Sequence, residues 1–149
     1  MRIIFCIILI TFSFMNILSA EENSYYLILK NNKVNVRYGP GFDYPIKFVY
    51  NKKNLPVKVI DKKENFRRII DHKKNNGWIH VSQLRKSKSL ITIAQKILFK
   101  KPTKYSKPVA KLDEGRLLIV KICKKNWCNI KTNKYSGWVD KNNLWGKIN

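Results

Sequence analysis

Two cysteines, Cys123 and Cys128, have the residue type and spacing that most directly predict chemistry in this chain. The residues between them, Lys124–Trp127, indicate a hairpin loop, which would place the cysteines opposite each other on adjacent strands. Directly opposed strand positions have Cα atoms about 4.5–5.5 Å apart, which is within the range of a disulfide. We therefore predict a Cys123–Cys128 disulfide, formed in an oxidising compartment. The third cysteine, Cys6, lies in an apolar amino-terminal segment.

Zinc binding is the competing use of this cysteine pair, and the number of histidines argues against it. A structural zinc site needs four ligands at a recognisable spacing, and the chain offers only His72 and His80, both in the other copy of a repeat described below. We therefore predict no metal and no other cofactor.

A catalytic site is not indicated by the remaining polar residues. His72 lies in a polar turn, where a solvated side chain is expected, and His80 follows Trp78 on a strand, where a surface or half-buried position is expected. The acidic residues show no pairing typical of glycoside cleavage, and no glycine-rich loop is suited to binding phosphate. We predict that the protein is not an enzyme.

The first twenty residues show the pattern of a secretory signal peptide. Met1-Arg2 gives a positive start, an apolar run follows, and Ala20 is a small residue placed just before Glu21. We expect cleavage near Ala20–Glu21 and a periplasmic mature chain. The alternative is an uncleaved membrane anchor, although the apolar run is slightly shorter than the ~20 residues that span a bilayer.

The chain is strongly basic, with 31 Lys and Arg against 9 Asp and Glu and a formal net charge of +22. For an exported protein this charge favours contact with anionic surfaces, such as cell-wall polymers, lipid head groups or acidic proteins, and we do not expect nucleic acid as a partner. A coding bias that enriches Lys, Asn and Ile together would produce the same composition, so both explanations stay open.

Short runs of alternating apolar residues, separated by Gly, Pro, Asn and Lys, predict an all-β fold. One pattern occurs twice: GWI followed by Leu84 matches GWV followed by Leu144, and the two tryptophans, Trp78 and Trp138, are 138 − 78 = 60 residues apart. A repeat of this kind predicts two tandem domains. We place them at residues 24–93 and 94–147, joined through Ser89–Lys96 with almost no free linker and hence in a fixed mutual orientation.

A unit of about 60 residues buries only about 60% of its unfolded surface, so each domain needs large apolar side chains in its core. We predict that five residues serve this purpose: Trp78, Trp138, Trp127, Leu84 and Leu144.

Several linked motifs resemble the bacterial SH3-like (SH3b) modules of exported proteins. They are NVRYGPG at residues 35–41, YPI at 44–46, LPVKV at 55–59 and GWIHVSQL at 77–84. The second copy keeps GWV and Leu144 but lacks the NVRxGP signature. The tandem layout is similar to that of small SH3-like exported proteins of alphaproteobacteria. The resemblance implies two small barrels of strongly bent strands and a binding role without catalysis, directed at cell-wall peptides or at partner proteins.

The loop after the first signature motif is the candidate ligand site. Gly39-Pro40-Gly41 reverses the chain, but a turn does not need three aromatic residues. We therefore predict that Tyr38, Phe42 and Tyr44, with Arg37, form a ligand shelf. The alternative is that these rings cap a small core.

These features predict a monomeric, non-catalytic binding protein of the cell envelope that docks on peptidoglycan or its peptides. Two alternatives remain at this point: a periplasmic protein–protein interaction module, and a charge-driven binder of anionic lipid or nucleic acid.

Overall fold

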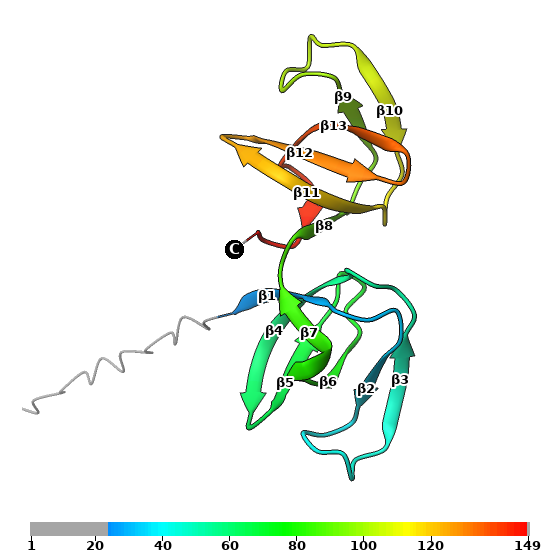
Figure 1. Ribbon diagram of the computed structural model, residues 1–149, viewed down its shortest axis with the longest axis vertical. Helices are drawn as coiled ribbons and strands as arrows, with labels where there is room; N and C mark the ends of the chain where they lie inside the picture. The colour runs from blue at the N-terminus through cyan, green and yellow to red at the C-terminus, as the bar shows by residue number, and fades with distance from the viewer. Residues whose placement is uncertain (1–23, 149) are drawn as a thin grey trace, which may run out of the picture.

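The computed structural model describes residues 24–148, which form two antiparallel sheets of seven strands each (Figure 1). The first sheet contains β1 (Tyr25–Leu29), β2 (Val34–Arg37), β3 (Ile46–Tyr50), β4 (Pro56–Lys63), β5 (Phe66–Ile70), β6 (Asn76–His80) and β7 (Leu84–Lys86), with a short 3₁₀ turn, η1 (Val81–Gln83), before β7. The second contains β8 (Ser89–Thr92), β9 (Lys96–Phe99), β10 (Pro108–Leu112), β11 (Leu117–Lys124), β12 (Trp127–Thr132), β13 (Tyr135–Asp140) and β14 (Leu144–Trp145). The all-β prediction is confirmed.

The two sheets have the same topology. Their strand orders are β3-β2-β6-β5-β4-β1-β7 and β10-β9-β13-β12-β11-β8-β14, so each strand of the second sheet occupies the place of the strand seven positions earlier. We call the two units the first and second module. The predicted signal peptide lies outside the described residues. No helix in the described part of the chain is long and apolar enough to cross a membrane.

The junction between the modules lies earlier than predicted. Strand β8 pairs with β11 and β14, so residues from Ser89 onward belong to the second sheet and not to the first. Only Ser87 and Lys88 separate β7 from β8. A run of alternating apolar residues indicates a strand, but it does not show which sheet that strand joins.

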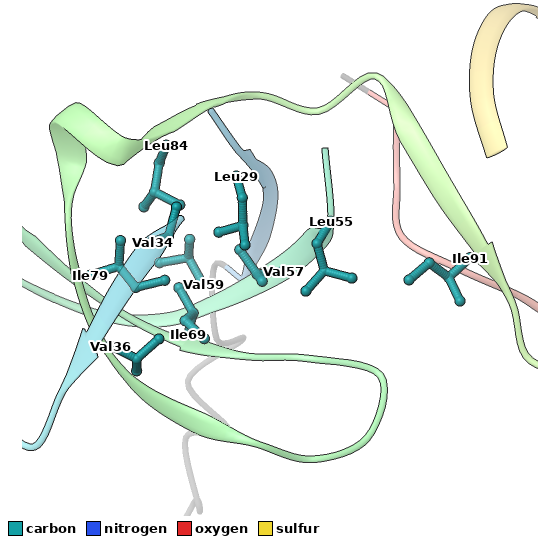
Figure 2. Packing of buried hydrophobic residues seen from close by; sticks show 10 residues of the cluster. All are labelled: Leu29, Val34, Val36, Leu55, Val57, Val59, Ile69, Ile79, Leu84 and Ile91. Atoms are coloured by element: carbon teal, nitrogen blue, oxygen red, sulfur yellow. The ribbon is translucent and has the colours of Figure 1, made fainter. Parts of the chain in front are cut away.

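Each module has its own apolar core. The first core contains ten buried side chains (Figure 2), which are Leu29, Val34, Val36, Leu55, Val57, Val59, Ile69, Ile79, Leu84 and Ile91. The second contains Leu90, Leu98, Leu112, Leu118, Cys128, Ile130 and Val139. Burial alternates along the strands, as in Val34–Arg37 and Asn76–His80, because successive side chains point to opposite faces.

The prediction that tryptophans form the cores is wrong. Trp78, Trp127 and Trp138 are half-buried and belong to neither core, and the aliphatic neighbours Ile79 and Val139 are fully buried in their place. Of the two predicted leucines, Leu84 belongs to the first core, whereas Leu144 is half-buried and packs against the second.

The glycine before each of these tryptophans has a packing role. A Cβ atom on Gly77 would lie 2.4 Å from Val36 Cγ1, and one on Gly137 would lie 2.6 Å from the carbonyl oxygen of Phe99. Glycine therefore allows β2 to approach β6, and β9 to approach β13, where each barrel closes. The tryptophan that follows faces the other side of the strand.

The modules share an apolar junction. Ile91, from β8, is part of the first core and lies beside Leu55 (Figure 2). Trp145 also packs against the first core, and its ring meets the ring of Tyr26 edge-on at a centroid distance of 5.7 Å. The Ser89 hydroxyl donates a hydrogen bond to the Asn54 carbonyl across the same junction. These contacts hold the modules in one relative orientation.

Candidate functional site

Three rings form a compact group at one corner of the first module. The ring centroids of Phe42, Phe66 and His80 lie 5.0–5.2 Å apart in all three pairs. The Arg37 guanidinium carbon lies 5.5 Å from the centroid of the Phe42 ring. We call these four residues the first aromatic face. Phe66 is buried, whereas the side chain of Phe42 is 65% exposed, so the group presents one outward ring on a buried support.

The strand register explains why these residues meet. Phe66 begins β5 and lies opposite His80, at the end of β6. Arg37 ends β2 and lies opposite Trp78. The loop between β2 and β3 starts at this corner, and it carries Phe42 over the pair formed by Phe66 and His80. The corner is therefore assembled from three strand ends and one loop.

Arg37 and two glycines shape the loop. The Arg37 guanidinium donates a hydrogen bond of 2.7 Å to the Tyr44 carbonyl, which ties the end of β2 to the far side of the loop. A Cβ atom on Gly39 would lie 2.3 Å from the Tyr44 ring, so glycine lets this ring lie directly on the loop backbone. Arg37 thus positions Phe42 by holding the loop as well as by contacting the ring.

The predicted ligand shelf is brought together only in part. Tyr38 and Tyr44 are exposed, at 62% and 43%, but the ring contacts in the described part of the chain join neither of them to Phe42. Tyr38 lies beside Lys47, whose ammonium group is 5.6 Å from its ring centroid. The partners of Phe42 are instead Phe66 and His80. Sequence reasoning missed both, although their pairing across the β5–β6 hairpin could have identified them.

The predicted disulfide between Cys123 and Cys128 is confirmed. The two residues are opposed on β11 and β12, and their Cα atoms are 4.0 Å apart. The bond closes the hairpin turn next to Trp127, the first residue of β12. In this way it restrains the position of a half-buried tryptophan at the module surface.

His72 is less exposed than predicted. Its side chain is half-buried, and its Nδ1 atom is buried without a hydrogen-bond partner. Burial lowers the pKa of His72, although the neighbouring Asp71 carboxylate opposes this shift. Asp71 itself is buried and accepts hydrogen bonds from the Tyr50 hydroxyl and the backbone of Asn75. Burial and the Asp71 carboxylate together raise the pKa of Tyr50.

A polar cleft of about 740 Å³ lies where the modules meet. Lys52 and Asn54 line it from the first module, and Asp113 to Leu117 and Lys131 to Asn133 line it from the second. Within residues 24–148 no group of three or more His, Cys, Asp and Glu side chains is placed to hold a metal ion.

Comparison with known proteins places both modules in one family. Residues 30–86 and residues 95–146 each match the family described as bacterial SH3 domain. No curated protein sequence matches the chain.

Two solved structures from Trichomonas vaginalis are similar to parts of this chain. NlpC2 is 11% identical, with a TM-score of 0.38, over 85% of this chain and 49% of that one. NlpC1 is 12% identical, with a TM-score of 0.39, over 87% of this chain and 48% of that one. The chain thus spans about half the length of each. From the two matched segments, which cover more than half of its residues, this chain belongs to the bacterial SH3 domain family.

Proposed function

We propose that this protein is an exported, non-catalytic binding protein of the cell envelope, and that its first module docks on peptidoglycan through the first aromatic face. The observation that carries the proposal is the position of Phe42. This ring is largely exposed, yet two rings and the Arg37 guanidinium hold it in place. A rigid, exposed aromatic ring contributes contact area at a low cost in conformational entropy, which is typical of binding surfaces.

The chemistry of peptidoglycan fits the surroundings of this face. The apolar faces of its sugar rings and the methyl groups of its alanines can pack on an aromatic ring, and its stem peptides carry free carboxylates. Cationic side chains border Phe42 and Phe66: Arg37 contacts Phe42, and Lys63 lies opposite Phe66 in the β4–β5 hairpin. Such cations attract carboxylates and help to orient them. Membership of the bacterial SH3 domain family supports a binding role in the cell wall.

The proposal is tested by co-sedimentation of the mature, oxidised protein with purified sacculi at low and at high salt. We expect binding that persists at high salt, because contacts made by ring packing are not screened by ions. Phe42→Ala should reduce it strongly. The control is Tyr135→Ala, which removes another exposed ring. Tyr135 is the first residue of β13, in the second module.

Two other results would each contradict the proposal. Binding that disappears at high salt and is indifferent to Phe42→Ala would show that charge alone drives it. If the protein does not bind sacculi at either salt concentration, in vivo cross-linking should be used to find a protein partner, which would favour the protein–protein alternative.

A further inference from the structure

The structure points to a second binding face, on the second module, that makes the protein bivalent for peptidoglycan. We infer that Trp127 and Phe99, with the lysines around them, bind another stem peptide of the same polymer. This inference rests on the proposed function. It is independent of the NVRxGP signature, which the second module lacks.

Register places Trp127 and Phe99 at the same corner that the first aromatic face occupies in the first module. Trp127 begins β12 and lies opposite Asp140 at the end of β13, as Phe66 lies opposite His80. Phe99 ends β9 and lies opposite Trp138, as Arg37 lies opposite Trp78.

The second corner is also aromatic, although different residues build it. The rings of Phe99 and Trp127 meet edge-on at a centroid distance of 5.9 Å, and both side chains are half-buried. The second module has therefore kept a supported, partly exposed pair of rings at this corner. We call this pair of rings the second aromatic face; Tyr105, on the adjoining β9–β10 loop, is 99% exposed.

Positive charge surrounds the second aromatic face. The β9–β10 loop, with the sequence KKPTKYSK, carries four lysines and no acidic residue. Lys124, at the end of β11, lies opposite Trp127, and Lys125 follows it in the β11–β12 turn. The one acidic residue of the corner, Asp140, is ion-paired with Lys96 at 2.8 Å. The face is therefore complementary to an anionic ligand, as a stem peptide with free carboxylates is.

The hairpin turn beside the aromatic residue is restrained in both modules, but by different chemistry. In the first module, Arg67 follows Phe66 and donates hydrogen bonds of 2.9 Å to the carbonyls of Glu64 and Phe66. In the second, Cys128 takes the place of Arg67, and the disulfide restrains the turn. The turns share a positive φ, of 47° at Glu64 and 48° at Lys125. A restrained turn in both modules holds each aromatic residue ready for a ligand.

A soluble disaccharide-tetrapeptide from peptidoglycan tests the inference by isothermal titration calorimetry on the full oxidised chain. We expect two ligands per wild-type chain. The variant Lys124→Glu/Lys125→Glu should bind one, since it reverses the charge of two exposed side chains that no core depends on. Trp127→Ala should give the same result. The matched control is Lys30→Glu/Lys33→Glu, which makes the same change in charge on two exposed side chains of the β1–β2 loop. These residues precede β2, whereas Arg37 is its last residue, and the control should still bind two ligands.

Sacculi provide the second readout. Because linked sites reinforce each other, Lys124→Glu/Lys125→Glu should weaken binding to intact sacculi at least about tenfold relative to the Lys30→Glu/Lys33→Glu control. If the wild type binds one ligand, and Phe42→Ala abolishes it while Lys124→Glu/Lys125→Glu behaves as the control, the second face is refuted and the proposed function stands. If the wild type binds neither the soluble ligand nor sacculi, both are overturned.

Discussion

Replacing Phe42 by alanine separates the two roles that its ring could have, ligand contact and core cap. Full burial of a phenylalanine side chain is worth about 1.5–3 kcal/mol. Phe42 is 65% exposed, so about a third of this value applies, and lost edge contacts with Phe66 add about 0.5–1.5 kcal/mol. We therefore expect Phe42→Ala to lower the free energy of unfolding by about 1–2.5 kcal/mol.

Phe66 supplies the comparison. It is only 6% exposed, so Phe66→Ala should cost about 3–5 kcal/mol, as truncation of a buried aromatic residue does. For Phe42→Ala, we expect the loss of binding affinity to be a larger effect than the loss of folding stability. A ring at the centre of an interface contributes about 2 kcal/mol or more, which corresponds to a loss of about 30-fold in affinity for sacculi.

Urea unfolding followed by tryptophan fluorescence measures the first effect, and binding isotherms with sacculi measure the second. Two results would refute the reasoning. One is a Phe42→Ala variant as unstable as Phe66→Ala. The other is a loss of sacculus binding by Phe42→Ala that is fully accounted for by the fraction of the variant that is unfolded. Either would show that Phe42 caps the module and is not a ligand contact.

Three further changes test other parts of the structure. Cys123→Ser/Cys128→Ser should lower the free energy of unfolding by about 2 kcal/mol, because the bond closes a short loop, and urea unfolding of the wild type with and without reductant should show the same difference. Gly137→Ala should lower the free energy of unfolding by about 1–3 kcal/mol, measured by thermal unfolding, since the new Cβ would lie 2.6 Å from the Phe99 carbonyl oxygen. The resulting movement of Phe99 should also weaken ligand binding at the second aromatic face. His72 should make stability depend on pH: its folded pKa is lowered, so the unfolded chain binds a proton more readily, and stability falls as pH drops through the unfolded value of 6.5 towards the folded pKa. His72→Gln should flatten urea-unfolding stability across that pH range, and an unchanged slope would assign it to other groups.

Much of the fold could be predicted because its determinants are local. Alternation in segments such as Val34–Arg37 reports directly which face is buried. The repeat around Gly77 and Gly137 marks the same barrel closure twice. The boundary between modules could not be predicted, because the pairing of β8 depends on strands β11 and β14, which are distant in sequence.

The candidate site was predicted less completely than the fold. Arg37 and Phe42 lie close together in sequence, on either side of the turn at Gly39-Pro40-Gly41, so a local motif identifies both. Phe66 and His80 are brought to them by the β5–β6 register and the closure of the barrel, which no local motif encodes. Trp78 and Trp138 were misassigned to the cores because size suggested burial, whereas strand alternation after Gly77 and Gly137 turns them outward.

The packing of Trp145 has a consequence for the order in which the chain can fold. This residue completes the first module's core cluster, yet it follows Lys86, the last residue of β7, by 145 − 86 = 59 residues. A chain made amino end first can pair every strand of its first sheet while that cluster still lacks Ile91, Leu117 and Trp145, which come later in the sequence. Contacts between residues so far apart in sequence form slowly. A nascent or truncated chain that stops short of Trp145 should therefore expose an apolar patch to proteases that the finished protein conceals.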